Sequence, residues 1–448
     1  MWAVLGCAAS VFAAPRAGAE ALLAIEADTG KVLYAHNATY PWYPASVTKL
    51  MTAYVTLSAV KEGRLTLDTP LTVSQNAVAQ APVKMGFSAG TIVTVDNALK
   101  MLMVKSANDM AVVLAEGVSG SIESFADEMN RNAQRLGMIQ SSFVNPNGLP
   151  ADEQISSARD LAILARALIR ELPEYDYYWH LPGIRMGKMV RWNYNTLIGR
   201  YPGADGMKTG FICASGFNLV ASATRNGKRL IAVVLGAPSS AARALKAAQL
   251  LERGFNSQNP LAWLTPSLGA VESLQPVAVD PPNMRDQMCG GHRKRPASED
   301  EDDLVAENSN PDSPYAAFLA SLRPGKAKAG FLQQDVPMAE PVLVYTGTTP
   351  PAPGTFQAGW KTSKPKVAKK TAAKAKDVDG AKPPAVTDKD GAKPAAAKSS
   401  KAAKPNAATA TPAESQAAKP KPKKPAPKNA PTALSPPPAS SEQTTQAR

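Results

Sequence analysis

The sequence predicts an α/β domain in which one sheet is flanked by helices, followed by a long disordered tail. Strand-like segments lie at both ends of residues 20–257, whereas helical periodicity fills the middle. Strands that enclose a run of helices in this way favour a single mixed or antiparallel sheet covered by helices. In residues 361–448 Lys, Ala, Pro, Ser and Thr recur, and a chain of this composition cannot bury a core.

The expected elements follow from periodicity and turn residues. The segment "ALLAIEADTGKVLYAHN" reads as a hairpin that turns at Asp28-Thr29-Gly30. A second hairpin is expected at residues 216–237, where Asn226-Gly227 is a strong two-residue turn. Apolar periodicity predicts helices at residues 47–60, 95–106, 109–118, 122–137, 158–172 and 241–255.

Residues 1–19 are expected to be a signal peptide. The segment "MWAVLGCAASVFAAP" is uncharged and mostly apolar, and Ala17-Gly18-Ala19 supplies the small residues of a signal-peptidase site. A buried first helix is one alternative, and lipidation of Cys7 within "VLGC" is another. An exported protein of the periplasm or cell envelope is therefore expected, with no membrane span after the leader.

Two cysteines, Cys213 and Cys289, remain once the leader is removed. In an oxidising compartment they are expected to form one disulfide, and two unpaired thiols are the alternative. The disulfide would hold the start of the linker that follows the domain, at Cys289, against the domain itself, at Cys213.

The net charge of +13 belongs to the tail. From Lys361 to Arg448 there are 18 Lys and 1 Arg against 4 Asp and 2 Glu, so residues 1–360 are neutral overall. No nucleic-acid partner is expected, while the tail is expected to contact an anionic cell-wall or membrane surface. Residues 258–360 form a linker of uncertain structure, with one acidic run, one basic run and apolar islands too small for a core.

A serine hydroxyl needs an adjacent base to act as a nucleophile. His36, His180 and His292 have no recognisable triad context, and no H-E-x-x-H or paired C-x-x-C predicts a metal site, so no cofactor is expected. The remaining base is Lys49, which shares a helix face with Ser46 at i and i+3. A lysine acts as a base only when neutral, a state that burial or a second cation promotes.

Two further polar segments fit this chemistry. Lys208 and Thr209 precede Gly210, which allows a ligand to approach the backbone closely. Ser106 and Asn108 lie in a polar break between two apolar helices, where they are suited to relay a proton and to orient a substrate amide. Each motif is weak alone, but S-x-x-K, S-x-N and K-T-G in this order form a specific set.

The set resembles that of the serine-type D-alanyl-D-alanine carboxypeptidases, low-molecular-mass penicillin-binding proteins of peptidase family S11. The resemblance also includes "YPASVTKLMTAY", "SSFVNPNGLP", "SARDLAILARALI" and "DGMKTGFICASGFNLVASATRNGKRLIAVVLGA", and covers roughly residues 20–257. It implies the transpeptidase/β-lactamase-like fold and a penicillin-sensitive acyl-enzyme. It also implies peptidoglycan stem peptides as substrate and β-lactam antibiotics as covalent inhibitors.

By this resemblance Ser46 attacks the carbonyl of the penultimate D-alanine with Lys49 as base, and Ser106 carries the proton to the leaving amine. The residues that the resemblance expects to bind substrate are Asn108, Lys208, Thr209, Gly210 and Phe211. Among them, the K-T pair would hold the terminal carboxylate. The backbone N–H groups of Ser46 and Phe211 would form the oxyanion hole.

Two features depart from the family's pattern. Several relatives carry N-R-N before K-T-G, and the Arg of this motif assists carboxylate binding. This chain has Asn193-Tyr194-Asn195 instead, so Arg191 or Arg200 would have to supply the missing positive charge. Many relatives also have a β-rich domain after the catalytic one, and residues 258–360 show no convincing strand alternation.

Three other functions fit parts of the pattern. A class A-like β-lactamase would need S-D-N and a deacylating glutamate in an E-x-x-L-N segment, which residues 145–180 lack. A DD-endopeptidase that cleaves peptidoglycan cross-links shares the chemistry and the motifs. A non-catalytic wall-binding module driven by the tail is disfavoured by intact Ser46, Lys49 and Lys208.

Truncation after residue 360 is expected to leave turnover of a soluble peptide unchanged and to weaken sedimentation with cell walls. Attraction between dispersed lysines and an anionic surface is screened over about 8 Å at physiological salt, so added salt should erase the difference. Equal sedimentation of the full-length and truncated proteins at low salt would contradict this role of the tail.

Overall fold

The computed structural model describes residues 20–256, 268–291 and 339–352, which all belong to one compact unit, Met1–Lys366. The expected signal peptide and the basic tail lie outside the described residues, as do residues 292–338 of the linker. The mixture of helices and sheet agrees with the predicted α/β class.

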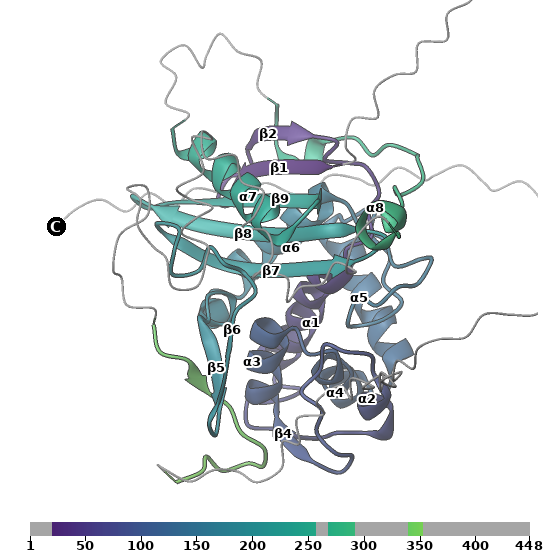
Figure 1. Cartoon of the computed structure of the whole chain (residues 1–448), viewed down its shortest axis with the longest axis vertical. Coiled ribbons are helices and arrows are strands. Elements are labelled where there is room, and N and C mark those ends of the chain that lie inside the picture. Colours follow the sequence, from purple (N-terminus) through teal and green to yellow (C-terminus); the bar gives the residue numbers. More distant parts are fainter. Residues whose placement is uncertain (1–19, 257–267, 292–338, 353–448) are drawn as a thin grey trace, which may run out of the picture. The chain divides into compact units, whose positions relative to one another are not determined.

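A five-stranded antiparallel sheet forms the centre of this unit, in the order β2-β1-β9-β8-β7 (Figure 1). Its strands are β1 (Ala21–Glu26), β2 (Val32–His36), β7 (Ala204–Ile212), β8 (Gly216–Arg225) and β9 (Lys228–Ala237). Both predicted hairpins are present, and Asn226 and Gly227 have the positive φ angles, 50° and 73°, that a two-residue turn requires. The two hairpins join where β1 pairs with β9 in the interior of the sheet.

Helices cover both faces of this sheet, which explains why residues 230–237 of β9 are buried without alternation. Helix α7 (Ser240–Phe255) packs against β8 and β9, and α6 (Ala158–Glu171) packs against β9 and β1 from the opposite side (Figure 1). Gly254 allows α7 to approach closely, because a Cβ there would lie 2.6 Å from the Leu230 side chain.

The other helices form a second part of the unit beside the sheet (Figure 1). They are η1 (Ala45–Thr48), α1 (Lys49–Lys61), α2 (Gln75–Ala79), α3 (Val95–Lys105), α4 (Asn108–Ser119), α5 (Ile122–Leu136) and η2 (Pro173–Trp179). All predicted helices are present, but the first is divided, since Ser46 lies in the 3-10 turn η1 and α1 begins only at Lys49.

Five helices begin at a serine or threonine whose hydroxyl accepts a hydrogen bond from the backbone N–H three residues later. The capping residues of α2, α3, α5, α6 and α7 are Ser74, Thr94, Ser121, Ser157 and Ser239. The starts of α3, α5, α6 and α7 lie within one residue of those that the sequence predicts, whereas α2 was not predicted.

Two small sheets were not predicted. Strand β3 (Pro70–Thr72) pairs with β4 (Ile92–Thr94), and a three-stranded sheet has the order β10-β5-β6. The second sheet consists of β5 (Gly183–Met186), β6 (Met189–Trp192) and β10 (Val342–Leu343).

Strand β10 comes from the apolar island "PVLVYTG", which the sequence analysis placed outside any core. Val344 is buried there, and its N–H donates to Arg185 O at 2.9 Å. Tyr345 N donates to Asn97 Oδ1 at 3.0 Å, which attaches the same segment to α3. The linker therefore returns to the domain at this point instead of leaving it altogether.

Residues 268–291 also pack against the domain. An antiparallel bridge joins Ala270 to Lys31, and η4 (Val271–Ser273) follows. The carboxylate of Glu272 accepts a hydrogen bond from Arg166 of α6 at 2.7 Å. The segment then ends in the short helix α8 (Arg285–Cys289).

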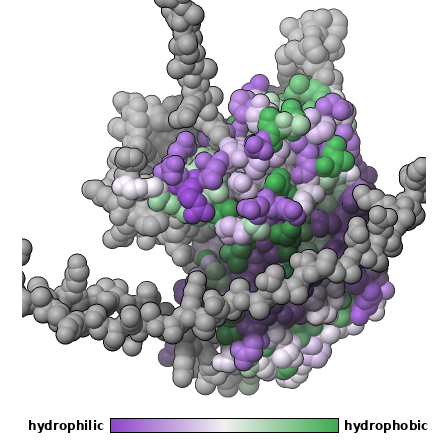
Figure 2. Space-filling view, turned by 90° about the vertical axis from the view of Figure 1, so that its right-hand side faces the viewer, coloured by the Kyte–Doolittle hydropathy of each residue, from purple (hydrophilic) through white to green (hydrophobic). Residues whose placement is uncertain are grey.

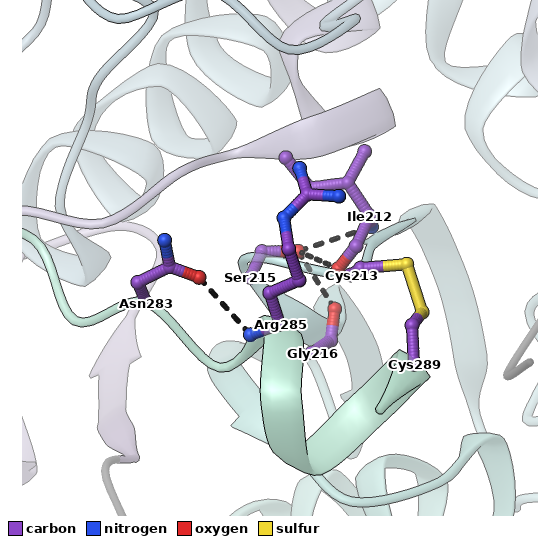
Figure 3. The surroundings of a disulfide bond; sticks show 7 residues. All are labelled: Ile212, Cys213, Ser215, Gly216, Asn283, Arg285 and Cys289. Atoms are coloured by element: carbon purple, nitrogen blue, oxygen red, sulfur yellow. Dashed lines mark hydrogen bonds between the residues drawn. A yellow bond between two sulfur atoms is a disulfide. The ribbon is translucent and has the colours of Figure 1, made fainter. Parts of the chain in front are cut away.

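Helix α8 is attached to the turn between β7 and β8 (Figure 3). Cys289 forms a disulfide with Cys213, with a Cα–Cα distance of 5.7 Å. Met284 N donates to Ala214 O at 2.9 Å, and the Met284 side chain is buried. The segment after α7 is thus fixed to the end of strand β7.

The face seen in Figure 2 shows hydrophobic and hydrophilic residues interspersed. Scattered apolar residues are ordinary on a folded domain, because its polar groups do not suffice to cover the whole surface. Among the helices in the described ranges, none is at once long and apolar enough to cross a membrane.

Replacing both Cys213 and Cys289 by serine is expected to lower the free energy of unfolding by about 4–5 kcal/mol. The bond closes a loop of 76 residues. When the bond is lost, the unfolded chain gains conformational entropy, and for a loop of this length that gain corresponds to the stated free energy. The melting temperature should fall by about 10–15 °C in a domain of this size. Reductant should reproduce the fall in the unaltered protein and leave the double variant unchanged. Alkylation of both thiols in native protein prepared under oxidising conditions would contradict the pairing.

Candidate active site

The chain leading into Ser46 is held in place by Asn218 of β8. The pairing of β8 with β9 is irregular at this residue, as in a β-bulge, and a bulge re-aims a side chain. The buried Nδ2 of Asn218 donates to Tyr43 O at 2.9 Å and to Pro44 O at 3.2 Å, while Oδ1 accepts from Gly236 N at 3.1 Å. One amide therefore fixes η1 to the sheet.

Strand β7 passes directly beside η1 at Gly210. A Cβ at this position would lie 2.9 Å from Ser46 N, 2.9 Å from Val47 N and 3.0 Å from Pro44 O. Any side chain would therefore push the strand away from the turn. The glycine of K-T-G is required by the packing of two backbone segments, in addition to the ligand approach expected from the sequence.

Lys49 begins α1, and its side chain is completely buried. Its Nζ donates to Ser46 Oγ at 2.9 Å, to Asn108 Oδ1 at 2.8 Å and to Asn147 O at 2.5 Å. Neither amide oxygen has a proton to give. Of these three contacts, only the one with Ser46 allows a proton to pass between the partners.

The S-x-N segment connects α3 to α4. Ser106 ends α3 with φ 58°, a conformation that L side chains rarely adopt, and its buried Oγ has no hydrogen-bond partner among the described residues. Asn108 begins α4, and its Nδ2 donates to Ala81 O at 3.0 Å. This bond orients the amide so that Oδ1 faces Lys49.

Asp109 holds the loop at residues 81–86, which also contacts Asn108 through Ala81. Its carboxylate accepts hydrogen bonds from Met85 N at 3.0 Å, Gly86 N at 2.8 Å and Met110 N at 2.9 Å. Burial raises the pKa of the Asp109 carboxyl above its ordinary value, although these backbone donors oppose the shift. The sequence analysis assigned no role to this residue, which positions the loop and contacts neither Ser46 nor Lys49.

Lys208 and Thr209 are buried in β7 beside Gly210, and Lys208 Nζ donates to Thr209 O at 3.1 Å. Phe211 is half-buried, with its ring centroid 4.4 Å from that of Phe217 on β8. Strand β7 is the last of its sheet, and no described strand pairs with its outer edge. An unpaired edge strand is suited to bind an extended peptide through backbone hydrogen bonds.

Residues 145–149 complete the site from the other side of η1. Gly148 has φ 77°, and a Cβ there would lie 1.9 Å from Ala45 O, so this loop also fits closely against the turn. Asn147 contributes its backbone carbonyl to Lys49. Sequence reasoning missed this contribution, since a carbonyl group is common to all residues and leaves no pattern.

The buried cation beside the N-Y-N segment is Arg243 of α7. Its Nη2 lies 3.4 Å from Tyr194 O, and its guanidinium lies 5.5 Å from the centroid of the Phe217 ring. Of the two arginines expected to compensate for the missing Arg, Arg191 is exposed on β6 and Arg200 is half-buried in the loop before β7. Arg243 was missed because an arginine in an amphipathic helix usually faces solvent.

Glu171 and Glu174 are the glutamates closest in sequence to the segment where a β-lactamase would carry its deacylating glutamate, and both lie away from Ser46. The Glu171 carboxylate accepts hydrogen bonds from the Tyr54 hydroxyl at 2.5 Å and from Arg135 Nη2 at 2.9 Å, and the Glu174 carboxylate pairs with Lys61 Nζ at 3.1 Å. Lys61 is the last residue of α1, about 18 Å along the helix from Lys49. Neither carboxylate is placed to activate water at the serine.

Comparison with known proteins agrees with this arrangement. The chain is 36% identical over 246 residues to D-alanyl-D-alanine carboxypeptidase DacA of Haemophilus influenzae, and 39% identical over 250 residues to DacC of Escherichia coli. Each alignment covers 54% of this chain, and they cover 63% and 62% of the relatives. The chain thus spans less than two thirds of the length of these curated relatives.

Solved structures show the same likeness. Penicillin binding protein 5 of Haemophilus influenzae is 36% identical with a TM-score of 0.52, over 54% of this chain and 72% of that one. The carboxypeptidase DacD of Francisella tularensis is 32% identical with a TM-score of 0.51, over 53% and 70% of the two chains. The transpeptidase-like fold expected from the sequence is therefore confirmed.

The chain also matches the family as a whole. The sequence profile of the D-alanyl-D-alanine carboxypeptidases, peptidase family S11, matches residues 8–239. That region contains η1, the S-x-N turn and strand β7, and it exceeds half of the 448 residues. The three motifs thus lie in a chain that belongs to the S11 family of D-alanyl-D-alanine carboxypeptidases.

Proposed function

We propose that this protein removes the terminal D-alanine from peptidoglycan stem pentapeptides through an acyl-enzyme on Ser46. The observation that carries the proposal is the 2.9 Å hydrogen bond between Ser46 Oγ and the buried amine of Lys49. Family membership supports it, as do the names of the relatives, which state this activity.

Acylation begins with transfer of the Ser46 proton to Lys49. Lys49 accepts this proton as the neutral amine, and its complete burial keeps bulk water away from the transfer. Ser46 Oγ then forms a bond to the carbonyl carbon of the penultimate D-alanine. The developing oxyanion is stabilised by the backbone N–H groups of Ser46 and Phe211, and each donor of this kind contributes about 10²–10³ in rate.

The tetrahedral intermediate collapses when the C–N bond to the terminal D-alanine breaks. The leaving amine takes a proton from Ser106 Oγ, which is replenished from Lys49. The buried Ser106 hydroxyl has no hydrogen-bond partner among the described residues, so it is available for this transfer. Water then attacks the ester, its proton returns through the same groups, and Ser46 is regenerated.

The substrate is held at both sides of the scissile bond. Lys208 and Thr209 bind the terminal carboxylate, with Asn108 holding the amide that precedes it. Gly210 keeps β7 close enough to η1 for one peptide to contact both. The buried guanidinium of Arg243 adds positive charge at the Phe217 ring on the neighbouring strand β8.

The same serine is proposed to react with β-lactam antibiotics, which present a strained acyl bond and a carboxylate. Similarity to a structure named as a penicillin binding protein supports this. Export to the periplasm or cell envelope fits the disulfide between Cys213 and Cys289, since such bonds persist in oxidising compartments.

Ser46→Ala is expected to abolish both D-alanine release from a stem pentapeptide and covalent labelling by a fluorescent penicillin. Lys49→Ala should slow acylation by about three orders of magnitude or more, because the base is lost. D-alanine release is measured by mass spectrometry and labelling by gel fluorescence.

Lys61→Ala, at the exposed end of the same helix, is the matched control and should retain full activity. Melting curves establish that each variant is folded. Persistent penicillin labelling of Ser46→Ala would place the nucleophile elsewhere.

The penicilloyl ester at Ser46 is expected to persist for minutes or longer, whereas the peptidyl ester turns over readily. Within the part of the chain that the structure describes, neither Glu171 nor Glu174 lies at Ser46 to activate water independently of Lys49 and Ser106, and a bulky penicilloyl group obstructs these two. Stopped-flow labelling followed by intact-mass analysis measures the lifetime. Loss of the penicilloyl group within a second would indicate a β-lactamase.

A further inference from the structure

Helix α8 presents an arginine at the end of the catalytic strand. Arg285 is the first residue of α8, and the disulfide between Cys289 and Cys213 fixes this helix beside the turn that follows β7. Met284 N, one residue earlier, donates to Ala214 O at 2.9 Å. The backbone of Arg285 is therefore held on both sides, although the residue follows the S-x-x-K, S-x-N and K-T-G motifs in the chain.

The Arg285 side chain extends toward Ile212, whose side chain shares a face of β7 with the position of Gly210 (Figure 3). A Cβ at Gly210 would point at Ser46 N, and in a strand the side chain two residues later points in the same direction. Ile212 is that residue, and Figure 3 shows the Arg285 side chain extending from α8 toward it. Arg285 is exposed and forms no ion pair with any other described residue.

The direction of a bound peptide follows from the proposed function, on which this inference rests. The terminal carboxylate lies at Lys208 and Thr209 and the scissile carbonyl lies beside Gly210, so the preceding residues run on toward Ile212. Thr209 and Ile212 are three residues apart, about 10 Å along a strand. An extended peptide covers about the same distance from its terminal carboxylate to the Cα of its third residue from the end.

We propose that Arg285 is a specificity-determining residue that binds a carboxylate on the side chain of that third residue. A guanidinium binds a carboxylate through two parallel hydrogen bonds, which gives orientation as well as attraction. The preferred substrate is then a peptide whose third residue from the end is a long dicarboxylic or diamino-dicarboxylic acid, in preference to one with a neutral side chain.

The test uses two synthetic peptides that differ in one charge: acetyl-L-2-aminopimelyl-D-alanyl-D-alanine and its side-chain amide. The full-length protein with its disulfide intact should release D-alanine from the carboxylate peptide with a kcat/KM about five- to tenfold higher. In Arg285→Gln this ratio should fall to about one, with kcat/KM for the amide unchanged. Arg285→Glu should reverse the preference, and Arg285→Lys should keep part of it.

Arg131→Gln, which removes an exposed cation from α5, is the matched control and should keep the full ratio. If both peptides are cleaved but the ratio is the same in the unaltered protein and in Arg285→Gln, the assignment of Arg285 is wrong while the proposed function stands. If the unaltered protein releases D-alanine from neither peptide, the proposed function fails and this inference fails with it.

Discussion

The complete burial of the Lys49 amine is the constraint on which the rest of the site depends. A buried polar group is stable only when its hydrogen bonds are satisfied, and the partners of this amine come from η1, the start of α4 and the loop at residues 145–149. Each of these pieces has its own support. Asn218 holds η1, Asp109 holds the loop over α4, and Gly148 lets the third segment fit against the turn.

Much of the site could be predicted because its chemistry depends on side-chain type. Ser46, Lys49, Asn108 and the K-T-G segment were all assigned from the sequence, and the structure brings the first three within hydrogen-bond distance. The fold was also predictable, since capped helices and an Asn-Gly turn leave strong local signals. The Asn147 carbonyl was missed because it acts through the backbone, and Arg243 was missed because an arginine in an amphipathic helix usually faces solvent. Strand β10 was missed because two residues are too few to show alternation.

The chain that follows α7 changes how the catalytic strand is supported. An edge strand has hydrogen bonds on one side only, and β7 must nevertheless keep a separation from η1 that leaves no room for a Cβ. Residues 268–291 contact the start of β2, helix α6 and the β7–β8 turn. They therefore connect β2 and β7, the two edge strands of the sheet. The strand beside Ser46 is thereby braced by a segment that supplies none of the residues proposed to acylate or deacylate the serine.

The disulfide also determines how tension would travel through the protein. It closes residues 213–289 into a covalent ring that contains β8, β9 and α7. A pull from the C-terminal side would first peel the two-residue strand β10 away and then reach Cys289, where the bond transmits the load to Cys213. The hydrogen bonds within the ring are bypassed, so β8 and β9 are not sheared. The load instead arrives at the end of β7, the strand that passes beside Ser46.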